Sequence, residues 1–163
     1  MFSDIQNHWT KASVLAAAWQ NILKGYPDGT FRPDAHVTRA EFAAIIYTPL
    51  SIKQSPYRAG VTFKDVPANH WAAKANCLQQ RFAIAQAYQT NYLSGYPNSL
   101  FQPNQMISRV QALTALVSGL NYGVTIEPIN TLKKNYTDFE QIPVYAVGAI
   151  ATATIGDFGL IPP

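Results

Sequence analysis

Two arginines occupy positions where a helix usually carries no cation. Arg39 and Arg109 each follow a hydroxyl residue, Thr38 or Ser108, at which a helix is predicted to begin. A cation in the first turn opposes the helix dipole, at a cost of up to ~1 kcal/mol. The free N–H groups of a helix start favour an anion, and a guanidinium beside them adds a two-pronged contact for a carboxylate or phosphate. The pattern predicts two acid-binding sites; the structural alternative is an arginine paired with an aspartate of a neighbouring repeat.

The residues around these arginines have a structural explanation. Thr38 with Glu41, and Ser108 with Gln111, have the spacing of a capping box. In this motif a hydroxyl, and a carboxyl or amide three residues later, satisfy N–H groups at the helix start. We therefore expect these four residues to position the helices.

The arginines belong to an internal repeat. Residues 25–34 (GYPDGTFRPD) return as residues 95–104 (GYPNSLFQPN), and in both stretches the arginine follows the glycine by fourteen positions. Such a repeat means that one supersecondary unit has been copied. The sequence divides into repeat one (1–50), repeat two (62–122) and a partial repeat three (135–163), with linkers at 51–61 and 123–134.

Apolar spacing predicts a helix, a loop and a second helix in each complete repeat. In repeat one the first helix is expected to end just before Gly25, which would be the left-handed residue beyond it. The second helix is expected from Thr38 to just before Pro49. The stretch 71–95 is eight residues longer than its counterpart 9–25, so repeat two has the longer first helix. The expected fold class is all-α.

Repeat three is incomplete. It begins near residues 136–139, and Tyr145 replaces the tryptophan of the other repeats. Ala146 and Ile150 continue a helical apolar face, but no second loop or helix follows. We expect this face to need a cover from another chain.

Aspartates and tryptophans hold further equivalent positions. Asp4, Asp65 and Asp138 each precede the first helix of a repeat. Local hydrogen bonds to the backbone explain them structurally, whereas bonds to a sugar hydroxyl would be functional. Trp9 and Trp71 open the first helices, where they serve either packing or a flat platform for a sugar ring.

Composition argues against several function classes. The net charge of +3 comes from basic residues scattered along the chain, unlike a nucleic-acid-binding surface. No apolar run reaches the roughly 18 residues of a membrane span, and no signal peptide follows Met1. His8, His36 and His70 lack the spacing of a metal site, so we expect no metal or cofactor. Cys77 is single and forms no internal disulfide.

Together these motifs resemble S-layer homology motifs. The match in repeat one rests on residues 2–5 (FSDI), 8–9 (HW), 25–33 (GYPDGTFRP) and 37–42 (VTRAEF). Repeat two is a recognisable variant. Residues 108–113 (SRVQAL) and 141–143 (QIP) are most similar to cyanobacterial envelope proteins.

The resemblance implies a fold and a ligand. Members form a pseudo-threefold bundle, in which each motif supplies a long helix, a loop and a shorter helix. They bind acidic polysaccharides linked to peptidoglycan, often bearing pyruvate ketals, in grooves between motifs. The motif arginine meets the ketal carboxylate, helped by the aspartate, the tryptophan and the glycine. Carried over to this chain, the ligand-binding residues are Arg39, Asp4, Trp9 and Gly25 in repeat one, Arg109, Asp65, Trp71 and Gly95 in repeat two, and Asp138 alone in repeat three.

The leading interpretation is a non-catalytic wall-binding module of the cell envelope that anchors a larger protein. The alternative is a structural interaction module that is completed by a partner chain or by self-association. Accessible arginines in a groove would favour the first, and an Ala146/Ile150 face buried against another chain would favour the second. A glycan hydrolase with paired carboxylates is a third interpretation, but most of the nine acidic residues are explained by turns and caps.

Overall fold

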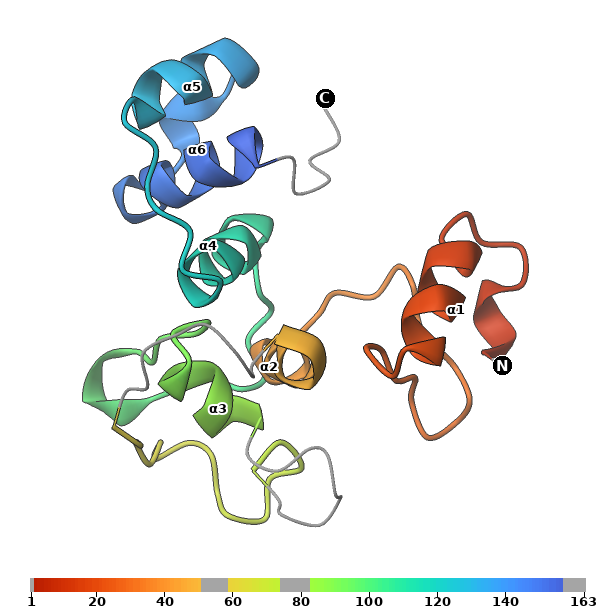
Figure 1. Ribbon diagram of the computed structural model, residues 1–163. Helices are drawn as coiled ribbons and strands as arrows, with labels where there is room; N and C mark the ends of the chain where they lie inside the picture. The colour runs from red at the N-terminus through yellow and green to blue at the C-terminus, as the bar shows by residue number, and fades with distance from the viewer. Residues whose placement is uncertain (1, 51–58, 74–82, 157–163) are drawn as a thin grey trace.

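The computed structural model describes residues 2–50, 59–73 and 83–156, except for the side chains of residues 47–50. Cys77 lies outside the described residues. Within them the regular elements are helices, and the only β-type pairings are two isolated bridges. The helices are α1 (Lys11–Trp19), α2 (Arg39–Leu50), α3 (Ala83–Gln89), α4 (Arg109–Gly119), α5 (Pro128–Asn135) and α6 (Val147–Ile155) (Figure 1). The predicted all-α class is confirmed.

Three helices end in the same way, at an asparagine. Asn21, Asn91 and Asn121 follow α1, α3 and α4 and have φ angles of 57°, 64° and 55°. Each donates its N–H to a carbonyl three residues back in the helix. A left-handed residue after the last turn satisfies carbonyls that the helix leaves free, and asparagine tolerates this conformation better than most residues.

The prediction that Gly25 ends the first helix was therefore wrong. Helix α1 stops at Trp19, and Gly29 is the described glycine with a left-handed φ, at 81°. Gly25 and its counterpart Gly95 are needed for a different reason. A Cβ atom at Gly25 would overlap the ring of Phe2, and one at Gly95 would overlap the ring of Phe63.

Helix α2 runs through Pro49 to Leu50, past the predicted end. Proline removes one N–H donor, and near the end of a helix this leaves most of the hydrogen-bond ladder intact.

The stretch 123–134, predicted as a linker, contains most of helix α5. Pro128 lies in its first turn, where its fixed φ suits a helix, and Lys133 and Lys134 lie in its last turn, where cations favour the dipole. Leu132 is the buried side chain of α5 and is 1% exposed. This helix has only 8 residues, fewer than the window over which an apolar periodicity is read, and its turn and proline signals predict a linker.

Helix α5 also corrects the expectation for repeat three. Ala146 and Ile150 are buried within this chain, in a cluster with Leu132, against which Val110 and Leu113 of α4 pack. The cover expected from another chain is thus provided by α4 and α5.

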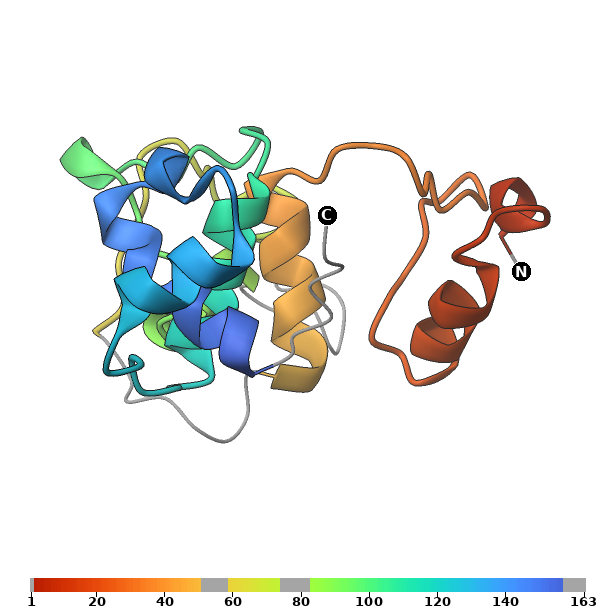
Figure 2. The same cartoon turned by 90° about the horizontal axis from the view of Figure 1, so that it is seen from above.

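Helices α2 to α6 form the body of the structure, and α1 stands apart from it. The extensive helix contacts join α2 to α3, α4 to α6 and α5 to α6. Both views place α1 and the loop after it beyond α2, on the far side from α4 (Figures 1 and 2). Ile5 and Val14 are buried in this N-terminal part, whereas Trp19 is 84% exposed. The pseudo-threefold placement of the repeats stays a prediction.

Truncating Leu132 to alanine should test the importance of α5. We expect a loss of about 2–4 kcal/mol in the free energy of unfolding, because the cavity lies where α5 and α6 meet. The matched control is Ile129→Ala on the same helix, where the side chain is 54% exposed and the change should stay within about 0.5 kcal/mol. Urea unfolding followed by circular dichroism measures both, and equal effects would contradict the packing described.

Candidate functional site

The loop of repeat one is held by the aspartate that precedes its first helix. The two carboxylate oxygens of Asp4 accept hydrogen bonds from the backbone N–H groups of Phe31, at 2.9 Å, and Arg32, at 2.6 Å. Desolvation opposes ionisation, but these two bonds lower the pKa of Asp4 below its ordinary value. The carboxylate of Asp4 therefore holds the backbone of this loop in place.

Repeat two is built identically. Asp65 accepts from the backbone N–H groups of Phe101, at 2.8 Å, and Gln102, at 2.6 Å. Asp138 is exposed and its side chain caps no helix, because no such loop follows it in the described chain. The structure therefore supports the structural explanation of Asp4 and Asp65.

Arg39 does not face solvent. It is 4% exposed, and its guanidinium donates from Nε to the carbonyl of Phe101, at 2.8 Å, and from Nη2 to that of Ser94, at 2.7 Å. Its Cζ lies 4.8 Å from the ring centre of Tyr96 and 4.7 Å from that of Phe101. Burial lowers the pKa of Arg39, while Tyr96 and Asp65 oppose that shift. Arg39 of repeat one thus holds the loop of repeat two.

The backbone at the start of α2 joins the same loop. The N–H groups of Arg39 and Ala40 donate to the carbonyls of Gln105, at 2.8 Å, and Pro103, at 3.0 Å. These are donors that a helix start leaves free, so at α2 a carbonyl pair occupies the position predicted for an anion.

Both predicted capping boxes are confirmed. The N–H of Glu41 donates to Thr38 Oγ1 at 3.2 Å, and Glu41 Oε2 accepts from the N–H of Thr38 at 2.8 Å. Ser108 and Gln111 make the same reciprocal pair, at 3.2 Å in each direction. Each cap aims the arginine that follows it.

The predicted ligand residues are grouped across repeats and not within them. Arg39 lies with Asp65 and Gly95, which belong to repeat two, and not with Asp4 and Gly25. Arg109, its counterpart on α4, is exposed and makes no hydrogen bond or ion pair with any described residue.

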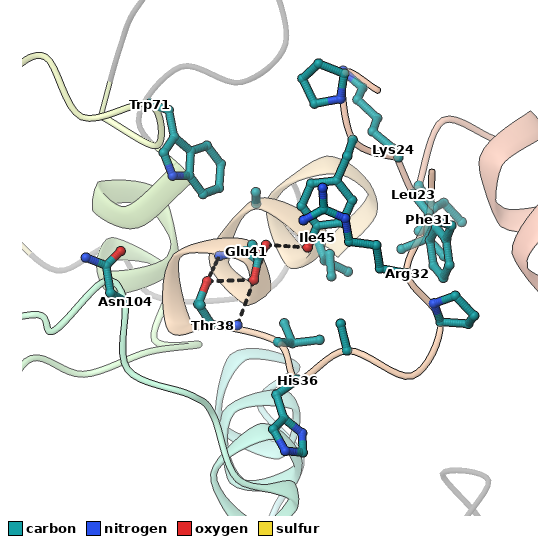
Figure 3. Close-up of a pocket in the computed structure, with 18 residues that line it drawn as sticks. Leu23, Lys24, Phe31, Arg32, His36, Thr38, Glu41, Ile45, Trp71 and Asn104 are labelled. Carbon is teal, nitrogen blue, oxygen red and sulfur yellow. Dashed lines mark hydrogen bonds between the residues drawn. The ribbon is translucent and has the colours of Figure 1, made fainter. Parts of the chain in front are cut away.

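A groove of about 680 Å³ lies between the loop of repeat one, helix α2 and two residues of repeat two, Trp71 and Asn104 (Figure 3). It is lined by residues 22–27, 31–33 and 35–37, by Thr38, Glu41, Ala44 and Ile45, and by Trp71 and Asn104. Trp71 and Asn104 face it from one side of α2, and Lys24, Phe31 and Arg32 from the other. Of the predicted ligand residues, Gly25 and Trp71 line this groove, and Asp4, Trp9, Arg39, Asp65, Gly95, Arg109 and Asp138 do not.

The polar wall of the groove contains Arg32, which the sequence did not single out. Arg32 stacks on Tyr26, with 3.9 Å from its Cζ to the ring centre, and its Nη2 lies 2.8 Å from Asp28 Oδ2. The Tyr26 hydroxyl donates to Glu41 at 2.6 Å, which raises the pKa of Tyr26. In repeat two Gln102 stands in place of Arg32. That difference between the repeats was the sequence signal that could have identified Arg32 as a candidate binding residue.

The two tryptophans differ in their surroundings. Trp71 is 50% exposed within the groove, whereas Trp9 is 82% exposed outside it. Each stands next to a histidine whose Nδ1 accepts the backbone N–H two residues further on, His8 from Thr10 and His70 from Ala72, both at 3.2 Å. These histidines therefore stabilise turns. No cluster of three or more candidate metal ligands occurs among the described residues.

Comparison with known proteins shows what the repeats are similar to. The S-layer homology domain model matches residues 2–43 and 83–113. Cell surface glycoprotein 1 of Acetivibrio thermocellus is 31% identical over 149 residues, which are 86% of this chain and 6% of that protein. The Cellulosome-anchoring protein of the same organism is 33% identical over 121 residues, 73% of this chain and 25% of that protein. The Surface layer protein of Brevibacillus choshinensis is 26% identical over 110 residues.

The chain spans a quarter or less of these three relatives. Exoglucanase XynX of Acetivibrio thermocellus is also similar, at 28% identity, but only 13% of its length is covered, so the match assigns no catalytic role to this chain. The expected likeness to cyanobacterial envelope proteins is not supported by these relatives, which come from Acetivibrio and Brevibacillus.

Replacing Arg39 should separate its role from that of Arg109. Arg39→Ala leaves the carbonyls of Ser94 and Phe101 without their charged donor, and we expect the free energy of unfolding to fall by about 2–4 kcal/mol. The control, Arg109→Ala, removes an exposed side chain and should change it by less than about 0.5 kcal/mol. Urea unfolding at low protein concentration measures both. Equal stability of the two variants would sink the assigned role of Arg39.

Asp28 should remain ionised in acid. The Thr30 hydroxyl, the Arg32 guanidinium and the Thr30 N–H hold the pKa of Asp28 at about 2, below its ordinary 3.8. A depressed folded pKa means that this contribution to stability is complete above about pH 3.8 and is lost as the pH falls through about 2. Carboxyl-carbon NMR measures the titration. Thr30→Val should move the pKa of Asp28 upward, and an ordinary pKa with Thr30 in place would refute the assignment.

Proposed function

Since this chain carries S-layer homology motifs, we propose that it is a non-catalytic module that anchors a larger protein to the cell wall. Relatives named as a cell surface glycoprotein, a cellulosome-anchoring protein and a surface layer protein support this role and a place in the cell envelope. None of the described helices is both long and apolar enough to cross a membrane. The attachment proposed is the binding of a wall polymer.

The groove beside α2 is the proposed binding site, and its mixed chemistry is the observation that carries the proposal. Lys24 and Arg32 bring positive charge, and Trp71 brings a flat, half-exposed ring. The carboxylate of Glu41 already accepts hydrogen bonds from Thr38 and Tyr26, so it repels an acidic ligand less than a free carboxylate would.

This combination suits an acidic polysaccharide linked to peptidoglycan. A sugar ring stacks on an indole face through its apolar C–H groups. A carboxylate, such as that of a pyruvate ketal, forms charge-assisted hydrogen bonds with a guanidinium. Arg32 is the residue proposed for that contact, because its side chain is about half exposed while it rests on Tyr26.

The other ligand residues expected from the family have structural roles in this proposal or lie away from the groove. Gly25 lines the groove, where a side chain would overlap Phe2. Asp4 and Asp65 shape the loops, and Arg39 would have to leave two carbonyls before it could contact a ligand. Arg109 is accessible, but it lies away from the groove lining.

Co-sedimentation with purified wall sacculi tests this proposal. Sacculi from a panel of bacteria that includes Acetivibrio thermocellus should retain the chain, and hydrofluoric acid, which strips the attached polymers, should abolish retention. Trp71→Ala and Arg32→Gln should each weaken binding about tenfold, because each removes one contact of the size of a hydrogen bond to a charged group.

Trp19→Ala is the matched control, since that ring is 84% exposed and does not line the groove. If Trp19→Ala weakened binding as much as Trp71→Ala, the ligand would lie outside the proposed site. Undiminished binding to stripped sacculi would argue against a polymer ligand altogether.

A further inference from the structure

Four hydrogen bonds run from the start of α2 to the loop of repeat two, beside the packing of α2 on α3 and a bond from the N–H of Ile107 to the carbonyl of Val37. Two donors are the Nε and Nη2 atoms of Arg39, and two are backbone N–H groups, of Arg39 and Ala40. The four acceptors are the carbonyls of Ser94, Phe101, Pro103 and Gln105. The rings of Tyr96 and Phe101 flank the guanidinium. This is a specific receptor for a helix that begins with an arginine.

Repeat one contains the same set of loop carbonyls without a partner, although the ring of Tyr26 already carries Arg32 where repeat two has Gln102. Residues 24–35 correspond position by position to residues 94–105. The counterpart carbonyls belong to Lys24, Phe31, Pro33 and Ala35, and none of them accepts a hydrogen bond from any described residue.

The shape of the empty loop is preserved. Tyr26 donates its N–H to the carbonyl of Thr30 at 2.8 Å, as Tyr96 does to Leu100 at 2.7 Å. The burial differs as expected for a missing partner, because Phe101 is 0% exposed and Phe31 is only partly buried.

Repeat two contains the matching donor without an acceptor. Arg109 corresponds to Arg39, and its side chain is exposed with no partner among residues 2–50, 59–73 and 83–156. The backbone N–H groups of Arg109 and Val110 likewise donate to no described acceptor. The Ser108–Gln111 capping box gives the start of α4 the same capped form as the start of α2, which is docked on its loop.

We propose that the Arg109 end of one molecule docks into the loop of residues 24–35 of a second copy of this chain. The occupant is a second copy because α4 is the one described helix start that has the arginine, the cap and the free N–H groups together. Within one molecule the two surfaces are apart, since α2 lies between α4 and the loop of repeat one (Figures 1 and 2).

The contact is head-to-tail. Each molecule keeps one free donor end and one free receptor after pairing, so the assembly grows into a ring or an open filament and does not stop at a symmetric dimer. The receptor shares residues with the groove proposed for the wall polymer, so docking would narrow that groove. The assembly itself requires no polymer.

Two variants that block opposite ends test the direction of the contact. Arg109→Glu places a carboxylate against the receptor carbonyls, and Ala35→Arg adds a long cationic side chain to a loop that already carries Lys24 and Arg32. Both side chains are exposed, so both variants should fold as the native chain does. Sedimentation velocity without wall polymer, from about 10 to about 500 µM, follows association in the range expected for a small contact.

The native chain should grow in mass with concentration, and each variant alone should stay monomeric. An equimolar mixture should form a heterodimer and nothing larger, because it combines one intact donor with one intact receptor. Self-association of either variant alone, or a mixture that stays monomeric while the native chain assembles, would overturn the proposal.

Hydrogen exchange at the amides of Arg109 and Val110 provides a second readout. Protection of these amides should rise with protein concentration in the native chain. A native chain that stays monomeric at the highest concentration would exclude a second copy as the occupant. Protection at all concentrations would place the docked helix start within a single molecule.

Discussion

The burial of one guanidinium governs how the repeats are joined. Arg39 loses its water and in return reaches the carbonyls of Ser94 and Phe101 between two aromatic rings. Removing a charge from water is unfavourable unless its donors are satisfied, so the loop of repeat two must hold these carbonyls in a fixed position. That requirement accounts for the aspartate that clamps the loop and for the helix cap that aims the arginine.

The same chemistry changes how family residues are interpreted in this chain. Asp65 and Gly95 shape a loop whose immediate partner is Arg39, and the positive charge that lines the groove belongs to Arg32 and Lys24. A groove therefore remains where repeat one meets Trp71, beside a contact that is already complete. The proposed recognition and the proposed assembly both use the loop of repeat one.

Much of this organisation could be predicted from the sequence because it depends on short-range spacing. The all-α class, the capping boxes and the equivalence of Arg39 with Arg109 follow from residues three to fourteen positions apart. The end of α1 and the existence of α5 could not, since a left-handed asparagine gives no strong local signal and α5 has only 8 residues. Sequence likewise identified Trp71 but not Arg32.

The sequence by itself determined which residues repeat and what each can bond. Only the tertiary structure decided which repeat each residue serves, because hydrogen bonds between residues 55 and 62 positions apart, as Arg39 makes, have no local signature. Burial settled the rest: the arginines at 39 and 109 have equivalent capping boxes and similar neighbours in sequence, yet one is enclosed and the other faces water. The difference arises from whether a loop of the next repeat lies within reach of the guanidinium.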